Sequence, residues 1–201
     1  IARMVKVRGW EHIETALSKG KGLILVTAHF GNTDVVAQVP ALRDIRVVAP
    51  AEHVQPEVLF QYLCSLRANK GLRLIPIDGP LFELFRALRR NEVVGLAADR
   101  DLTDSGIVVE FFGTPARLPD GYAQLSLRTG APIIVGFSHR QPDNTFVVHL
   151  EPPLELEATG DRERDVRAGV EQVVAIMERY IGAHPEQWVM SVPLWQMAGD
   201  Q

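Results

Sequence analysis

The stretch GLILVTA at residues 22–28, followed at once by HFGNTD at residues 29–34, decides the fold of this chain. A short unbroken apolar run bounded by glycine is typical of a strand that is buried on both faces, as in a parallel sheet. Open α/β sheets bind their ligands at the carboxyl ends of such strands. His29 therefore stands where a functional site is expected.

The rest of the chain alternates between strand-like and helix-like segments. Strands are expected at residues 45–49, 72–76, 93–98, 107–112, 132–138 and 145–150, and helices at residues 33–39, 56–70, 80–90, 120–128 and 161–183. This alternation predicts an α/β fold, a single-domain sandwich whose central mixed, largely parallel sheet is flanked by helices. No linker is long enough to divide residues 1–201, so one domain is expected.

Composition limits the classes of function. The 201 residues carry a net charge of −4, which gives no electrostatic footprint for general binding to nucleic acid. Cys64 is the only cysteine, so neither an internal disulfide nor a cysteine-based zinc site can form. No apolar run in the sequence approaches the roughly 18 residues that indicate a membrane-spanning helix.

His29 and Asp34 are the first candidate pair. A histidine with an orienting carboxylate can act as a general base on a substrate hydroxyl, without a separate nucleophile on the protein. Five residues along a regular helix would put the two side chains about 140° apart, so the turn after the strand would have to bring them together. The alternative is a histidine bonded to the backbone, with Asp34 as a charge at the start of a helix.

Asp99, Arg100 and Asp101 follow the apolar strand expected at residues 93–98. Three charges at the end of a buried strand favour a site over a solvated surface, and the alternative is a salt bridge within the loop. Because Asp104 extends the pattern, a divalent cation is also conceivable here.

Two weaker candidates come from other loops. The stretch FFGTPAR at residues 111–117 could bind phosphate through the backbone at Gly113 and the guanidinium of Arg117. Its alternative is a hairpin turn with an ordinary surface arginine. Glu52 and Arg67 stand 15 residues apart and could line a site or form an ion pair.

Two stretches are candidates for contact with lipid. Residues 1–10 mix apolar side chains with Arg3, Lys6 and Arg8, and residues 188–197 carry two tryptophans. Cationic and aromatic mixtures suit a membrane interface. Either stretch could instead belong to the core or to a dimer surface.

In combination, these motifs resemble the lysophospholipid acyltransferase superfamily. Within it they resemble the branch of the lipid A late acyltransferases and the phosphatidylinositol mannoside acyltransferases. The H-x4-(D/E) motif of that family matches residues 29–34, its acidic-basic strand end matches LAADRD at residues 96–101, and its Gly-Thr/Pro-Arg loop matches residues 111–117. The TGAP turn at residues 129–132 and the tail at residues 184–196 are similar to the same branch. One departure is Thr33-Asp34, where lipid A enzymes often carry Trp-Glu.

The resemblance implies transfer of a fatty acyl group from acyl-CoA or acyl carrier protein to a hydroxyl of a membrane phospholipid or glycolipid, with no cofactor and no metal. His29 would be the general base and Asp34 its orienting partner, with Asp99, by analogy with the mannoside branch, as an alternative or additional contact of the imidazole. Backbone N–H groups near Gly31 and Asn32, or around Gly113, are expected at the oxyanion. The remaining residues expected to line or bind substrate are Glu52, Arg67, Arg100, Asp101 and Arg117.

The resemblance also implies a location. The protein would be peripheral or anchored at the cytoplasmic face of the bacterial inner membrane, and residues 1–201 would lack an N-terminal membrane-associating segment of the family. Two alternatives stay open. One is a metal-dependent glycosyl- or phosphoryl-transferase that uses Asp99 and Asp101, and the other is a non-catalytic lipid-binding module.

Overall fold

A computed structural model describes residues 4–68, 71–77, 82–102 and 104–195. The central sheet contains β1 (Val5–Arg8), β2 (Leu23–Thr27), β3 (Val47–Ala51), β4 (Leu72–Pro76), β5 (Val93–Ala97), β8 (Ile133–Arg140) and β9 (Phe146–Leu150). A separate hairpin contains β6 (Ile107–Phe111) and β7 (Thr114–Leu118). The helices are α1 (Trp10–Ser18), α2 (Thr33–Gln38), α3 (Glu57–Ala68), α4 (Phe82–Arg89), α5 (Gly121–Thr129) and α6 (Arg162–Ala183).

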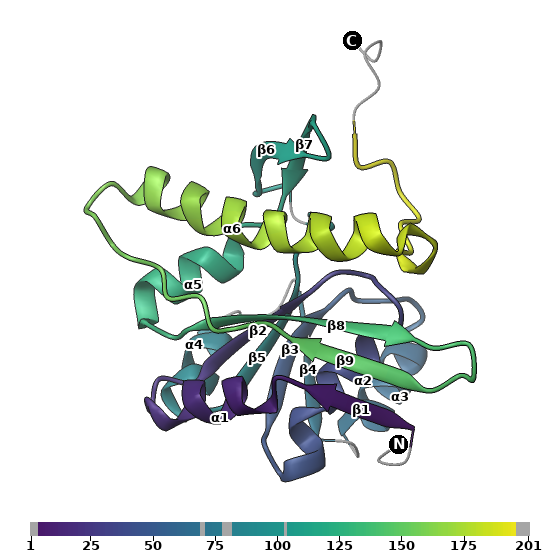
Figure 1. The fold of residues 1–201 in the computed structure, drawn as a ribbon. Coiled ribbons are helices and arrows are strands. Elements are labelled where there is room, and N and C mark those ends of the chain that lie inside the picture. Colours follow the sequence, from purple (N-terminus) through teal and green to yellow (C-terminus); the bar gives the residue numbers. More distant parts are fainter. Residues whose placement is uncertain (1–3, 69–70, 78–81, 103, 196–201) are drawn as a thin grey trace.

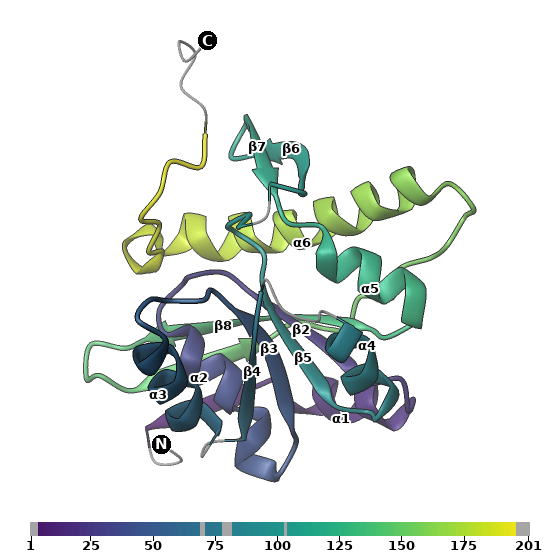
Figure 2. The ribbon, with the colours of Figure 1, turned by 180° about the vertical axis from the view of Figure 1, so that it is seen from behind.

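The sheet has the strand order β1-β9-β8-β2-β5-β3-β4, and each neighbouring pair is parallel except β8 with β9. Helices α1 and α2 pack on one face, and α4, α5 and α6 pack on the other (Figure 1, Figure 2). The α/β class and the mixed, largely parallel sheet predicted from the sequence are confirmed.

Strand β2 lies near the centre of this sheet, between β8 and β5. Leu23 and Leu25 point into the apolar cluster under α1 and α2, whereas Ile24 and Val26 point into the cluster under α4, α5 and α6. Because both faces are covered, positions 23–26 of the strand must be apolar, and the polar Thr27 stands at its carboxyl end. This requirement explains the unbroken run in the sequence.

The sheet opens between β3 and β5. These two strands pair only at Val47↔Val93 and Val48↔Val94, whereas β3 with β4 and β2 with β5 pair along their whole length. Beyond Val48 and Val94 the strands separate toward their carboxyl ends. The opening lies at the edge of the sheet where α/β proteins bind ligands.

The hairpin of β6 and β7 replaces the phosphate loop that residues 111–117 suggested. Phe112 and Gly113 make the tight turn, with φ of 51° and 72°, and two successive left-handed residues are typical of a two-residue hairpin loop. In Figure 1 the hairpin projects beyond α6, away from the central sheet. The alternative interpretation, a hairpin turn, is therefore the one observed.

The two stretches proposed for lipid contact are built into the fold. Part of the first is β1, which pairs with β9 and turns Val5 and Val7 toward the core, while Trp10 begins α1. Arg3 of the first stretch and Met197 of the second lie outside the described residues. So do residues 69–70 and 80–81, which belong to the helices expected at 56–70 and 80–90. Within the described ranges, no helix is long and apolar enough to cross a membrane.

Candidate active site

The register of β2 and β5 brings His29 and Asp99 together. Thr27 faces Ala97 at the ends of the two strands, and His29 and Asp99 each follow by two residues. The imidazole Nδ1 of His29 lies 2.8 Å from Oδ1 of Asp99. The backbone N–H of His29 donates to Oδ2 of the same carboxylate at 2.8 Å. Asp99 therefore holds both the ring and the backbone of His29.

The Asp99 carboxylate is buried, with a relative exposure of 0%. A buried charge is costly unless hydrogen bonds compensate it. Besides the two bonds with His29, Oδ2 accepts a third from the indole Nε1–H of Trp188 at 2.9 Å. The carboxylate thus has a hydrogen-bond partner on each oxygen, which compensates for its burial.

The His29 side chain is 41% exposed. Its hydrogen bond with Asp99 raises the pKa of the imidazole above the ordinary value, and the charge of Asp99 adds to the rise. Partial burial and the charge of Arg100 act in the opposite direction. Because Nδ1 is held by Asp99, Nε2 is the ring nitrogen that can exchange a proton with a ligand.

Asp34 does not contact His29, so the expected His29–Asp34 pair is wrong. Asp34 lies in the first turn of α2, whose N-cap Asn32 accepts the backbone N–H of Val35 through its side chain at 3.3 Å. Both carboxylate oxygens of Asp34 accept bonds from Arg67 of α3, at 2.8 and 3.1 Å. The helix turns Asp34 away from the preceding strand and toward α3, and the second motif supplies the carboxylate instead.

A cavity of about 780 Å³ opens beside His29, where β3 and β5 separate. Its walls are mostly apolar and come from β2, β3, β4, β5, α2, α4 and α5, and α3 contributes Arg67. Six of the predicted site residues line it: His29, Asp34, Glu52, Arg67, Arg100 and Asp101. The cavity therefore combines a long apolar surface with a polar set of side chains that includes the imidazole.

The polar side chains of this cavity are paired with one another. Oε2 of Glu52 lies 3.3 Å from a guanidinium nitrogen of Arg100. The suggested ion pair between Glu52 and Arg67 is therefore replaced by two separate pairs, Glu52–Arg100 and Asp34–Arg67. Asp101 accepts the backbone N–H of Gly106 at 2.7 Å, which closes the loop after β5.

Three of the expected binding roles fall elsewhere. Gly113 is at the turn of the hairpin, and Arg117 is exposed on β7 and donates to the carbonyl of Gly106 at 2.8 Å, so neither lines the cavity. Near Asn32, the backbone N–H of Gly31 is already used, because it donates to the carbonyl of Gln187 at 2.7 Å.

The described residues contain no group of three or more His, Cys, Asp or Glu side chains that could hold a metal ion. Asp99 is occupied by N–H donors, and Asp101 accepts one from Gly106. The geometry therefore favours proton transfer at His29 over a role of Asp99 and Asp101 as metal ligands.

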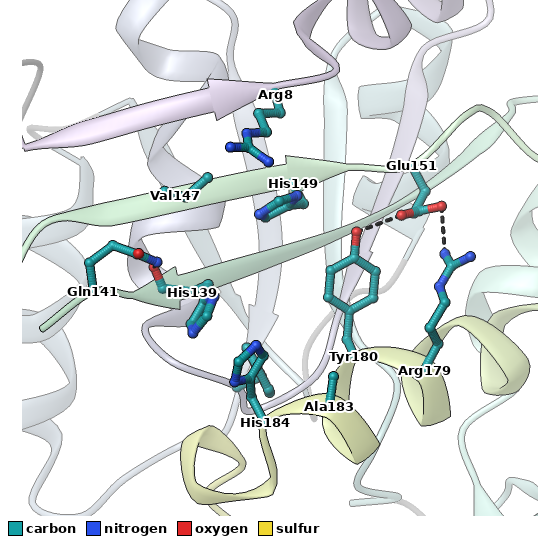
Figure 3. Close-up of a pocket in the computed structure, with 11 residues that line it drawn as sticks. Arg8, His139, Gln141, Val147, His149, Glu151, Arg179, Tyr180, Ala183 and His184 are labelled. Atoms are coloured by element: carbon teal, nitrogen blue, oxygen red, sulfur yellow. Dashed lines mark hydrogen bonds and ion pairs between the residues drawn. The ribbon is translucent and has the colours of Figure 1, made fainter.

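A second hollow, of about 530 Å³, lies between β9 and α6 (Figure 3). The rings of His139 and His184 approach to 4.0 Å on one side of it. On the other, Glu151 accepts the hydroxyl of Tyr180 at 2.5 Å and pairs with Arg179 at 2.6 Å. Burial and the nearby His184 lower the pKa of His139.

Trp188 is the site residue that sequence reasoning missed. It belongs to the stretch 188–197, for which the sequence suggests lipid contact. In the structure its indole N–H donates to Asp99, 89 positions away in the sequence. No local signal marks a tryptophan as a hydrogen-bond donor to a distant carboxylate. Only the similarity of the tail at residues 184–196 to one enzyme branch hinted at a role.

The sequence matches the family described as bacterial lipid A biosynthesis acyltransferase over residues 1–197. It is 33% identical over 193 residues to the phosphatidylinositol mannoside acyltransferase of Mycobacterium tuberculosis and 30% identical over 189 residues to that of Mycolicibacterium smegmatis. It is 28% identical over 194 residues to the lipid A biosynthesis lauroyltransferase of Escherichia coli. These alignments cover 94%, 92% and 94% of this chain, and 59%, 60% and 61% of the relatives. The chain thus spans about three fifths of their length. The chain belongs to the bacterial lipid A biosynthesis acyltransferase family.

Proposed function

We propose that this chain carries the active site of an acyltransferase, which moves a fatty acyl group from a thioester to a hydroxyl of a membrane phospholipid or glycolipid. The observation that supports this most directly is the His29–Asp99 pair at the edge of a largely apolar cavity of about 780 Å³. A general base and an apolar cavity are two of the features that transfer of a fatty acyl group to an alcohol uses. Family membership supports the same reaction class.

In the proposed reaction, Nε2 of His29 takes the proton of the acceptor hydroxyl while the hydroxyl oxygen attacks the thioester carbonyl. The carbon–oxygen bond forms, the carbon–sulfur bond breaks, and the thiolate leaves. The imidazolium returns the proton to the thiolate, so His29 ends the cycle neutral. Asp99 fixes the tautomer with the proton on Nδ1 and stabilises the imidazolium that forms between the two steps.

The cavity suits an acyl chain. Leu25 and Leu74 contribute to its apolar walls, and small residues such as Ala49 and Gly95 leave space between the strands. Its volume falls within the range of about 300–1,000 Å³ that is usual for small-molecule sites. We propose that the acyl chain of the donor lies here, with its thioester carbon near His29.

The two ion pairs at the cavity suit the acceptor. Asp34–Arg67 and Glu52–Arg100 present charged groups that can bind the hydroxyls or phosphate of a head group. The names of the relatives, which refer to phosphatidylinositol mannoside and to lipid A, support a lipid or glycolipid acceptor. Because acyl-CoA and acyl carrier protein are cytoplasmic donors, we place the reaction at the cytoplasmic surface of the membrane.

The test is an acyl-transfer assay with acyl-CoA and acyl carrier protein as alternative donors and membrane lipids as acceptors. His29→Ala is expected to lower turnover by roughly 10²–10⁴-fold, the usual contribution of a general base. His149→Ala, which removes an imidazole from the second hollow, is the matched control and is expected to retain activity.

Three results would count against the proposal. Near-wild-type turnover in His29→Ala would remove His29 from the mechanism. Loss of activity with a chelator would favour the metal-dependent alternative. Lipid binding without thioester cleavage by the wild type would favour a lipid-binding module.

A further inference from the structure

The geometry points to Trp188 as a positioning residue for the proposed reaction: its indole N–H fixes the Asp99 carboxylate that orients His29. This inference rests on the proposed function, in which His29 is the base. It also assigns a role to the C-terminal segment of the structure, residues 184–195, which folds against the loop that carries His29.

The carboxylate of Asp99 needs a donor other than His29 to hold its plane. Its terminal torsion is soft, and the two bonds from His29 hold the carboxylate only relative to His29 itself. Oδ1 faces Nδ1 of His29, and Oδ2 accepts both the backbone N–H of His29 and the indole of Trp188. Of these three donors, Trp188 is the one that lies outside His29 itself, so among the described residues it ties the carboxylate to a different part of the fold.

Backbone hydrogen bonds position Trp188 beside the Asp99 carboxylate. Val189 N–H donates to the carbonyl of His29 at 2.7 Å, and Gly31 N–H donates to the carbonyl of Gln187 at 2.7 Å. These two bonds flank Trp188 and pair its segment with the loop 29–31. The loop that carries the His29 imidazole therefore also fixes the position of Trp188.

Side chains anchor the segment on its other side. The amide of Gln187 accepts the backbone N–H of Arg140 at 2.9 Å and donates to the Arg140 carbonyl at 3.0 Å. His184 lies against His139, as Figure 3 shows. Both contacts fasten the segment to the end of β8.

The aromatic surroundings direct the indole. Phe111 lies edge-on to Trp188 with ring centroids 5.9 Å apart, and Trp195 does so at 6.2 Å. Phe112 completes the contact at 6.4 Å. The β6–β7 hairpin, which does not line the cavity through Gly113 or Arg117, thus acts on the site by packing against Trp188.

Loss of this donor should alter the proton affinity of His29 in a definite direction. The positive end of the indole N–H dipole faces the carboxylate, so its removal makes the potential at His29 more negative and favours the imidazolium. The other charges near the imidazole are Arg100, Glu52, Asp34, Arg67 and Asp101, and a Trp188 variant leaves all of them in place.

The experiment compares Trp188→Phe with the matched control Trp195→Phe. Trp195 belongs to the same segment and stacks on Phe111 with centroids 6.1 Å apart, but its Nε1 donates to the carbonyl of Phe111 and not to Asp99. NMR titration of the His29 imidazole should show a pKa higher by roughly half a unit to one unit in Trp188→Phe and unchanged in Trp195→Phe. Turnover should fall most in mildly acidic buffer and recover in part at alkaline pH, where the remaining loss reports the orientation of the ring.

An equal His29 pKa in Trp188→Phe and wild type would overturn the inference, as would a loss of turnover that is the same at every pH. If Trp188→Phe does not fold, the wild type still provides a test. The indole N–H resonance of Trp188 should shift as His29 titrates, whereas that of Trp195 should not, and two insensitive resonances would also overturn it. These titrations need no substrate, so a wild type that transfers no acyl group would refute the proposed function and leave this test standing.

Discussion

The carboxylate of Asp99 is buried, while the imidazole that it holds is 41% exposed. This difference decides which of the two groups exchanges protons with a ligand. Asp99 is held by hydrogen bonds to the ring and the backbone N–H of His29 and to the indole of Trp188. Asp34, by contrast, pairs with Arg67 rather than with the imidazole.

The raised pKa of His29 predicts a pH dependence. Only the neutral imidazole can accept a proton, so kcat/KM should fall as the pH drops through the His29 pKa, which lies above the ordinary value of 6.5. Asp99→Asn removes the charge that raises this pKa and replaces the charge-assisted hydrogen bond by a weaker neutral one. The acidic limb should therefore move to lower pH, while the maximal rate falls because the ring loses its orientation.

The matched control for this prediction is Asp34→Asn, measured over the same pH range. It should leave the acidic limb in place, because Asp34 bonds to Arg67 and not to the imidazole. If the acidic limb of the kcat/KM profile moves in Asp34→Asn and stays in place in Asp99→Asn, the His29–Asp34 pair expected from the sequence is supported instead.

Gly31 provides a prediction about stability. Its φ is 58°, and a Cβ built there would lie 1.7 Å from the carbonyl oxygen of Ser138, which is backbone and cannot move aside. Gly31→Ala should therefore shift the His29 loop, abolish activity and lower the free energy of unfolding by more than the roughly 1–2 kcal/mol of a left-handed alanine alone. Gly20→Ala is the control, because Gly20 also has a positive φ, 69°, but a Cβ built there would meet no other group within 4 Å. Equal unfolding midpoints for the two variants in urea would contradict this account.

At the scale of elements, the separation of β3 from β5 creates the cavity. A parallel sheet that stayed paired to its carboxyl edge would close this space with backbone hydrogen bonds. Here Ala49 and Ala51 on β3 face the cavity, as do Gly95 and Ala97 on β5. Small side chains on both strands leave the gap between them unfilled. The residue types of β3 and β5 therefore keep the cavity open.

Gly95 allows the acyl-chain proposal to be tested. An added Cβ would lie 3.6 Å from Val47 and 3.7 Å from Ala49, ordinary contact distances, so Gly95→Ala should be nearly neutral. Gly95→Leu should fill part of the cavity and exclude one or two methylenes of the chain. At about 0.8 kcal/mol per buried methylene, kcat/KM should drop roughly 4- to 15-fold for long-chain donors and less for short ones.

Donor series of increasing chain length give the measurement for both Gly95 variants. A loss in Gly95→Leu that is equal for every chain length would place the acyl chain outside this part of the cavity.

Much of the fold could be predicted from local pattern, because strand and helix periodicity are local properties. The strand expected at residues 72–76 is β4 as observed, and the run at 22–28 contains β2. Strand order is not local. Whether Asp34 or Asp99 meets His29 depends on β5 lying beside β2, and nothing in the sequence of either strand states which neighbour it takes.

Among the strands and α-helices, β1, α1 and β7 escaped prediction, and physical reasons account for the two strands. β1 has four residues and sits at the edge of the sheet, so its alternation is too short to distinguish from a basic, apolar tail. β7 contains Pro115 and Arg117, and proline is confined to edge positions in sheets, so its sequence favours a loop. Because β7 is a strand of the hairpin, Arg117 lies on that hairpin and does not line the cavity.

For the whole molecule, the proposed lipid acceptor requires that one surface meets the membrane. The net charge of −4 does not favour attraction to anionic lipid, and Lys6 and Arg8 are the described basic residues of the N-terminal stretch. Exposed apolar side chains gather instead on α3. Val58, Tyr62 and Leu66 are spaced four residues apart and form one stripe, with Val58 78% exposed. The same helix supplies Arg67 to the cavity.

This stripe predicts apolar rather than electrostatic membrane binding. Replacement of Val58, Tyr62 and Leu66 by serine should reduce co-sedimentation with vesicles and lower transfer to a lipid embedded in them. Transfer to a short-chain acceptor dissolved in water should persist, because Asp34–Arg67 and the cavity are unchanged. Binding by the wild type should survive high salt, since burial of apolar surface is not screened as surface charge is.

The comparison that decides the point is the double variant Lys6→Glu with Arg8→Glu, measured on neutral and on anionic vesicles. Each basic residue near an anionic leaflet contributes about 1 kcal/mol, and that contribution fades within a Debye length. If the α3 stripe makes the contact, this charge reversal should change little on neutral vesicles, and the serine variant should fail on both kinds. If the charge reversal abolishes binding while the serine variant binds normally, the basic edge strand β1 docks on the membrane and the apolar stripe of α3 does not.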